Sequence, residues 1–294
     1  MKLKSKGSKM TDTKKTQVVK TKENAGQSQV VGMEDYDLDE LTSDVGLGSE
    51  GLSAEDIAIP YLGILQGLSP QVTEGKEGFI EGARPSMLFN NVTGEIYEGR
   101  KEGVLLVPAF YRKQWLVWMD RDSGGGLVDV YDDDSIMADT VKNDKNQNVV
   151  KDNHNLIVFE TAQHFCLRLN QETSETERVV VSLKSTGLKA NRKLNHAITS
   201  AKIPGHPTVS APRFMFAYRM TTFLEEKNNN SWWSPSFTRM KDPVAKFVYD
   251  EAKTYYELVK SGAVKISEEP TPDEASSGLS NQQETAEDSE EIPF

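Results

Sequence analysis

A stretch of the chain from residue 178 to residue 224 contains eight Lys and Arg residues and no Asp or Glu. The whole chain is acidic, with a formal net charge of −11, so this local excess of cations needs a cause. Lys and Arg neutralise nucleic-acid phosphates and release counterions, which gives affinity without sequence preference. The alternative is a solvated basic face that balances acids elsewhere in the fold. The eight cations are Arg178, Lys184, Lys189, Arg192, Lys193, Lys202, Arg213 and Arg219.

Aromatic residues alternate with cations in two of the strand-like segments, and a Trp pair lies in a polar segment. In "RFMFAYR" (213–219) the two-residue period of a strand separates Phe214, Phe216 and Tyr218 from the two Arg residues. Bases of a single strand stack on exposed rings, at about 1–3 kcal/mol per base. The alternative is core packing, because alternate aromatic residues of a strand are often buried. As further contacts with DNA we predict Tyr111, Arg112, Lys113, Trp115, Trp232 and Trp233.

The chain ends in "ETAEDSEEIPF", an acidic segment that finishes with an apolar tip. Phe294 can enter an apolar pocket of a partner while a basic residue of that partner binds the terminal carboxylate. The acids before it steer the tip to a basic rim. The alternative is a solubilising tail with an accidental end. The predicted partner-binding residues are Glu290, Glu291, Ile292, Pro293 and Phe294.

This tip resembles the acidic C-terminal tip of bacterial single-stranded-DNA-binding proteins, which recruits replication and repair proteins. The segments "DIAIPYLGILQGLSPQV", "ARPSMLFNNVTGEIYEG" and "LLVPAFYRKQW" are similar to bacteriophage-encoded single-stranded-DNA-binding proteins of the replication module. The resemblance implies an OB-like fold, no catalysis, no cofactor and a place in the cytoplasm of the host bacterium. It implies single-stranded DNA and tip-binding replication or repair proteins as partners. The number of subunits stays open, with a homo-oligomer among the options.

Two other functions stay open. One is a nucleic-acid enzyme, such as a nuclease or a recombination annealing protein, with Mg²⁺ at Asp132–Asp134. The other is a phage structural or adaptor protein with no role on DNA. Metal ligation is otherwise not indicated, because His154, His164, His196, His206 and Cys166 lack the spacing of a metal site.

The charges divide the chain into arms and a body. Residues 1–33 carry eight Lys against two acids, whereas residues 34–60 and 266–294 each carry nine acids and no base. Segments so polar bury too little apolar surface to fold alone. We therefore predict a disordered arm over 1–51, basic and then acidic, a folded DNA-binding body over 52–265, and a disordered acidic tail over 266–294.

Within the body the pattern is mainly β with a few helices, which suits an OB-like barrel with insertions. We expect antiparallel strands over 154–170 and 176–186, a hairpin over 213–240, and a long mobile excursion over 120–152. Helical spacing predicts one helix over 187–202 and a second from Asp242, with Pro243 in its first turn, to Gly262.

Targeting signals are not evident in the sequence. No run reaches the ~18 apolar residues of a membrane helix, and the Lys-rich start lacks the apolar stretch of a secretory signal. Met10 is a second candidate start. The single cysteine, Cys166, excludes an intrachain disulfide and fits a reducing compartment.

Overall fold

The computed structural model describes residues 37–52, 59–227, 230–262 and 264. The chain divides into two compact units, Met1–Gly51 and Leu52–Phe294. The described part of the first unit holds a short helix, α1 (Leu38–Ser43), whose first turn is capped where the Asp39 N–H donates to Asp37 Oδ1 at 2.9 Å. Most of the predicted arms, and the tip Glu290–Phe294, lie outside the described residues.

The second unit is built on one long antiparallel ribbon, β4 paired with β8 from Leu105↔Leu169 to Met119↔Leu156. The outer edge of β4 pairs with β12 along one part and with β5 along another. In the same way, the outer edge of β8 pairs with β9 and with β7. The ribbon therefore continues into a half-sheet at each end. The unit is mainly β, as predicted. The strands of the ribbon and of its half-sheets are β4 (Val104–Met119), β5 (Leu127–Tyr131), β6 (Thr140–Lys142), β7 (Asn148–Val150), β8 (Asn153–Leu169), β9 (Thr176–Lys184), β12 (Phe216–Lys227) and β13 (Asn230–Pro243).

β4 tolerates a proline because the ladder is interrupted there. Pro108 has no N–H to donate, and the register between β4 and β8 shifts between Pro108 and Phe110. The rest of the strand is rich in β-branched and aromatic residues, which favour a pleated, half-buried strand. One continuous strand therefore crosses the whole unit.

A second, small sheet spans the gap between the edge strands β9 and β13. Tyr61 forms a parallel bridge with Val180, and the Val180 N–H donates to the Pro60 carbonyl at 2.8 Å. Gln66 then joins this segment to β13, because its side chain donates to the carbonyl and accepts from the N–H of Trp233 at 2.9 and 2.8 Å. The result is a curled half-barrel. The small sheet contains β1 (Leu62–Ile64), β2 (Leu88–Asn90) and β3 (Ile96–Tyr97).

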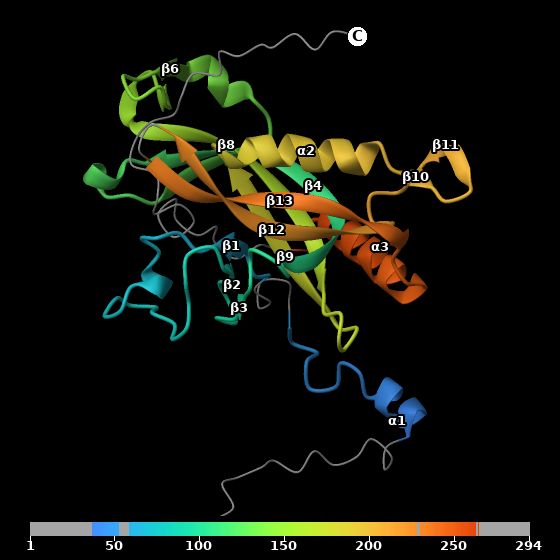
Figure 1. The fold of residues 1–294 in the computed structure, drawn as a ribbon. Helices are drawn as coiled ribbons and strands as arrows, with labels where there is room; N and C mark the ends of the chain where they lie inside the picture. The colour runs from blue at the N-terminus through green and yellow to red at the C-terminus, as the bar shows by residue number, and fades with distance from the viewer. Residues whose placement is uncertain (1–36, 53–58, 228–229, 263, 265–294) are drawn as a thin grey trace, which may run out of the picture. The chain divides into compact units, whose positions relative to one another are not determined.

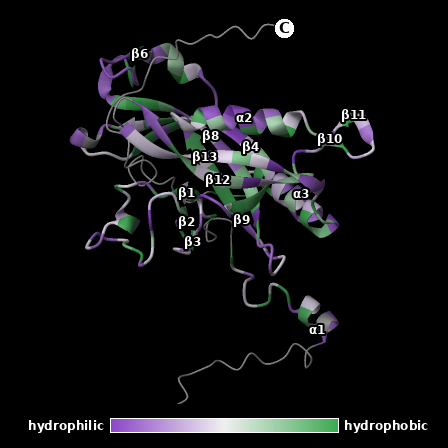
Figure 2. Ribbon diagram, viewed as in Figure 1, coloured by the Kyte–Doolittle hydropathy of each residue, from purple (hydrophilic) through white to green (hydrophobic). Residues whose placement is uncertain are grey.

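Two helices cover opposite faces of the β4–β8 ribbon (Figure 1). On one face His164 contacts α2 (Gly187–Thr199). On the other, Phe165 packs against Tyr255 of α3 (Lys246–Lys260) with the ring centroids 6.3 Å apart. Hydrophobic residues are concentrated in the strands between the two helices, whereas hydrophilic and hydrophobic residues alternate along α2 (Figure 2).

The helix predictions hold for α2 and in part for α3. α2 buries Leu194 and Ile198, as the spacing predicts. α3 begins at Lys246 rather than near Asp242, because β13 continues to Pro243, which stays paired with Phe216. Among the helices of the described ranges, none has the length and apolar character needed to cross a bilayer.

The predicted mobile excursion over 120–152 is folded in large part. It carries β5, β6, β7 and a 3-10 helix (Ser135–Asp139) and buries Ile136 and Val149. Its few apolar residues are scattered among many Asp and Gly residues and give no periodic pattern. In the structure they pack against Trp115 and Val158 of the ribbon. The segment is therefore an insertion with its own small core. The remaining strands form a two-stranded strap, β10 (Lys202–Ile203) and β11 (His206–Ser210).

The junction between the small sheet and β12 depends on a residue without a side chain. A Cβ atom on Gly99 would lie 1.9 Å from the Ser86 carbonyl oxygen and 2.7 Å from Thr222 Oγ1. The Thr222 N–H and hydroxyl donate to the carbonyls of Gly99 and Ser86, both at 2.7 Å. This close approach fixes the small sheet against β12.

We expect Gly99→Ala to lower the free energy of unfolding by about 1–3 kcal/mol, because the added methyl group must push backbone atoms apart. Urea denaturation would measure this. Gly67→Ala is the matched control, since a Cβ there meets nothing within 4 Å, and it should stay within about 0.5 kcal/mol of the unaltered protein. Equal stability of the two variants would contradict the packing described.

Candidate nucleic-acid interface

The outer face of α2 is a compact set of cations. Lys189, Arg192 and Lys193 are exposed, while Leu194 and Ile198 on the opposite face are buried. The three cations have no carboxylate partner within the described part of the chain. Because their charge is not neutralised locally, they can attract an anion such as a phosphate.

A buried polar cluster fixes α2 to the sheet. Arg213 Nη2 lies 2.8 Å from His164 Nδ1, and His164 Nε2 lies 2.8 Å from Asn191 Oδ1. Since Arg only donates, Nδ1 must accept, so the proton sits on Nε2 and is donated to Asn191. Arg213 also donates to Asn195 Oδ1 at 3.3 Å. Residues of α2, β8 and the segment before β12 are thereby held in one geometry.

Burial sets the protonation states in this cluster. It lowers the pKa of His164 to about 3, with the neighbouring charge of Arg213 adding to the effect. It also raises the pKa of the Cys166 thiol to about 12. An imidazole with so low a pKa is a weak general base, and a buried, protonated thiol is a poor nucleophile at neutral pH. The cluster therefore supports the fold and the placement of α2 rather than a reaction.

The predicted contacts on β4 divide between the two faces of the ribbon. Arg112 donates twice to Gln163 Oε1, at 3.0 and 2.8 Å. Tyr111 lies half-buried on the opposite face, with its ring 5.4 Å below the guanidinium of Arg213. On that same face Lys113 pairs with Glu160 at 2.9 Å. One surface cannot bring all of these side chains to the same ligand.

Trp115 lies in a hydrophobic cluster and is 8% exposed. Its neighbours include Val117 and Ile136, the latter from the insertion. The strand period placed it on a face with Lys113 but could not show that the insertion covers that face. In this arrangement the ring has no free π-face for a base, so it supports the core.

The tryptophan pair lies at the tip of the β12–β13 hairpin, with its two rings on opposite faces of the strand. Trp232 is tied down, because its Nε1 donates to Glu225 Oε2 and Ser234 Oγ at 3.1 and 3.0 Å. Trp233 is half-exposed, and the Arg100 guanidinium carbon lies 5.5 Å from its ring centroid. Of the pair, Trp233 is the better placed to accept a stacked base.

The other predicted cations are spread over the unit. Lys202 extends the exposed cations beyond α2, with Nζ 3.1 Å from Ser210 Oγ. Arg219 lies near the start of β12, away from the hairpin tip, and donates to the Glu102 carbonyl and to Gln171 Oε1. Lys184 on β9 has Nζ 5.8 Å from the centroid of the Trp118 ring. The structure thus gathers the α2 cations and Lys202 but not the whole predicted set.

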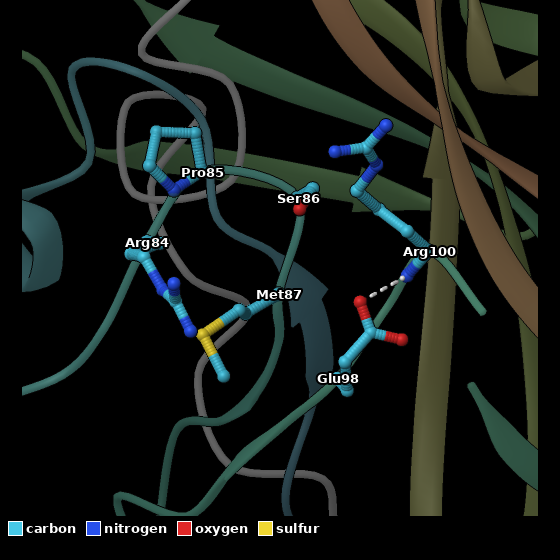
Figure 3. A pocket seen from close by; sticks show the side chains of 6 residues that line it. All are labelled: Arg84, Pro85, Ser86, Met87, Glu98 and Arg100. Atoms are coloured by element: carbon cyan, nitrogen blue, oxygen red, sulfur yellow. Dashed lines mark hydrogen bonds between the residues drawn. The ribbon is translucent and has the colours of Figure 1, made fainter. Parts of the chain in front are cut away.

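Two arginines that the sequence did not single out line a pocket beside the small sheet. Arg84 extends alongside Met87, and Arg100 points away from Glu98 (Figure 3). Both are exposed, and they lie outside the acid-free stretch that drew attention to the other cations. Their position beside turn residues is the one sequence feature that could have indicated these two arginines.

The carboxylates of the insertion do not converge. Gln114 Nε2 donates to Asp132 Oδ1 at 2.7 Å, and the Ser135 N–H donates to Asp133 Oδ1 at 3.0 Å. Among the residues that the structure describes, three or more His, Cys, Asp or Glu side chains nowhere gather as metal ligands would. The geometry thus offers nothing to favour a magnesium site at Asp132–Asp134.

Comparison with known proteins gives one match. The sequence model of a family described as "Pam3 phage gp34-like protein" matches residues 30–265, which is most of the chain. This agrees with the bacteriophage part of the resemblance seen in the sequence and leaves DNA binding as a prediction. None of the curated proteins searched and none of the solved structures searched matches the chain.

The low pKa of His164 predicts acid lability. Between about pH 6.5 and pH 3 the unfolded chain binds a proton at this residue and the folded chain does not, so stability falls as the pH falls. This residue should cost the protein about 2 kcal/mol between pH 7.5 and pH 5. Unfolding curves at both pH values should show that His164→Gln loses this part of the dependence.

Carboxylates contribute equally to both proteins, so the difference between the two slopes isolates His164. If the variant does not fold, NMR titration of the imidazole in the unaltered protein gives the pKa directly. A pKa near 6.5 would contradict the buried, neutral state.

Proposed function

Because this chain belongs to the Pam3 phage gp34-like protein family, we propose that it is a phage protein that binds single-stranded DNA without sequence specificity during replication or recombination. Its acidic C-terminal tip recruits replication or repair proteins of the host cell, and the protein catalyses no reaction. The observation that carries the proposal is the connectivity of the curled sheet together with the cationic helix that it displays.

The connectivity supports an OB-like barrel. An OB barrel is five-stranded and partly open; its first strand pairs with the second and fourth, and a helix joins the third to the fourth. Here β4 pairs with β8 and β12, β9 follows β8, α2 connects β9 to β12, and β13 completes the hairpin. Residues 120–152 then form an insertion between the first and second strands, and the small sheet spans the opening between β9 and β13.

The distribution of charge indicates which part of such a barrel can bind DNA. Both the first and the last loops of an OB barrel usually contact the strand. The insertion over 120–152 carries nine acids against four bases, which repels phosphates. The hairpin end carries Trp233 under Arg100 instead, and α2 presents Lys189, Arg192 and Lys193. The strand of DNA therefore contacts α2 and the β12–β13 hairpin.

Removal of the α2 cations should weaken binding to single-stranded DNA. The triple variant Lys189→Ala, Arg192→Ala, Lys193→Ala should lower affinity at least about tenfold at moderate salt and reduce the slope of log affinity against log salt by about 2, since each phosphate contact contributes about 0.7. Quenching of Trp fluorescence by an oligo-dT, compared with duplex of equal length, measures both quantities.

The matched control removes three exposed lysines from the acidic insertion, Lys142, Lys145 and Lys151. Its salt slope should equal that of the unaltered protein. Equal losses in the two variants would show that only the net charge matters, and lack of any quenching in the unaltered protein would exclude DNA binding and favour a structural or adaptor role.

The tip proposal is tested separately from DNA binding. Deletion of Ile292, Pro293 and Phe294 removes the apolar hook and leaves nearly all of the acidic charge in place. We expect loss of binding to host proteins that capture single-stranded-DNA-binding-protein tips, measured by calorimetry with a purified partner, and unchanged affinity for oligo-dT. Partner binding that survives the deletion would refute the assignment.

A further inference from the structure

We propose that the pocket between Arg84 and Arg100, together with the half-exposed ring of Trp233, forms a subsite for one nucleotide of a single strand. The two arginines bind a backbone phosphate, and the indole ring stacks on the adjoining base. The inference rests on the proposed function and assigns it a defined place on the barrel.

The pocket has a net positive charge, because two arginines and one carboxylate line it. Arg84 and Arg100 are exposed and make no ion pair with any residue that the structure describes. They line a pocket of about 210 Å³ with Pro85, Ser86, Met87 and Glu98. A guanidinium offers planar, paired donors that match the oxygens of a phosphate. The two guanidinium groups lie on different sides of the recess (Figure 3). Because both side chains are exposed, they can turn toward one phosphodiester bound between them.

The one carboxylate in the pocket is already occupied. Glu98 accepts backbone N–H groups from Arg100, Lys101 and Glu102 at 3.0, 2.7 and 3.0 Å. These bonds lower the pKa of Glu98, so the side chain stays ionised and bound to the loop. Its role is to fix the turn that carries Arg100 (Figure 3). Glu98 therefore shapes the loop. Its charge also interacts with that of Arg100, although the two side chains form no short ion pair.

The stacking surface adjoins the pocket. Arg100 lies 5.5 Å from the centroid of the Trp233 ring. Leu224 pairs with Trp233 across the hairpin and is 45% exposed, so it extends the apolar surface beside the ring. A half-exposed indole beside an arginine combines aromatic stacking with a cation–π contribution, and single-strand binding proteins use both to hold bases.

The scaffold under the subsite is rigid. Ser86 lies buried at the base of the pocket with φ of 84°, a conformation that non-glycine residues rarely adopt. Its carbonyl accepts the Thr222 hydroxyl at 2.7 Å, and the Gly99 carbonyl accepts the Thr222 N–H at the same distance. The pocket and the hairpin are thereby joined by two hydrogen bonds and one close backbone contact, so phosphate and base sites keep a fixed separation.

The test uses anisotropy of a labelled oligo-dT across salt concentrations, so that altering Trp233 does not remove the probe. Arg84→Gln with Arg100→Gln should weaken binding at least about tenfold and reduce the salt slope by about 0.7, the share of one phosphate. Trp233→Ala should weaken binding about fivefold to a hundredfold, the range for one stacked base, and should leave the salt slope unchanged.

A second oligonucleotide separates base from phosphate. Replacing bases by abasic residues should weaken binding of the unaltered protein, and Trp233→Ala should reduce that discrimination. Arg84→Gln with Arg100→Gln should keep it. The matched control, Lys253→Gln with Lys260→Gln, removes the same charge from exposed sites on α3 and should bind as the unaltered protein does.

The outcomes distinguish the subsite from the function. If the unaltered protein binds oligo-dT and the arginine variant binds equally well with the same salt slope, the subsite is refuted and the proposed function stands. Losses equal to those of the α3 control also refute it. If the unaltered protein does not bind single strands, the proposed function fails and the subsite fails with it.

Discussion

The register of the β4–β8 ladder is the constraint on which the rest of the unit depends. Side chains alternate across the ribbon, so His164 faces α2 while its neighbour Phe165 faces Tyr255 of α3. A slip by one residue would exchange the faces and bury charge against α3. The ladder shifts only where Pro108 interrupts it, and beyond that point Arg112 and Lys113 again face opposite sides. Both helices, and the cations of α2, thus take their places from one pairing.

The buried cluster converts that register into a position for α2. Arg213 is a cation without a carboxylate, held instead by a neutral imidazole, an amide oxygen and the face of Tyr111. Burying a charge in this way is costly, and the buried Nε of Arg213 finds no acceptor among the described residues. His164 can meet Arg213 and Asn191 only in one tautomer and one orientation. This energetic cost therefore selects a single position of α2 on the sheet, whereas apolar packing alone would tolerate several.

Periodicity in the sequence predicted which residues alternate but not which face is covered. It found the strand pairs and α2, since these depend on neighbours close in the chain. It placed Trp115 beside Lys113 without showing that Ile136, from a segment rich in Asp, would bury that ring. It also missed Arg84 and Arg100, and Arg100 meets Trp233 only after residues far apart in the sequence are joined through Thr222. Long-range closure of the sheet, not local preference, decided these positions.

Because the chain is acidic overall, the positions of its exposed cations are informative. A uniformly basic surface would attract any polyanion and would carry no information about a path. Here nine acids crowd the insertion at one end of the ribbon, and Glu98 and Glu225 are bound to the turn and hairpin that carry the exposed groups. The cations of α2, and Arg100 beside Trp233, lie on fixed elements and form no ion pair within the described residues. Under the proposed function, a flexible polyanion that stacks its bases fits this arrangement better than a stiff duplex, whose bases offer no free face to Trp233.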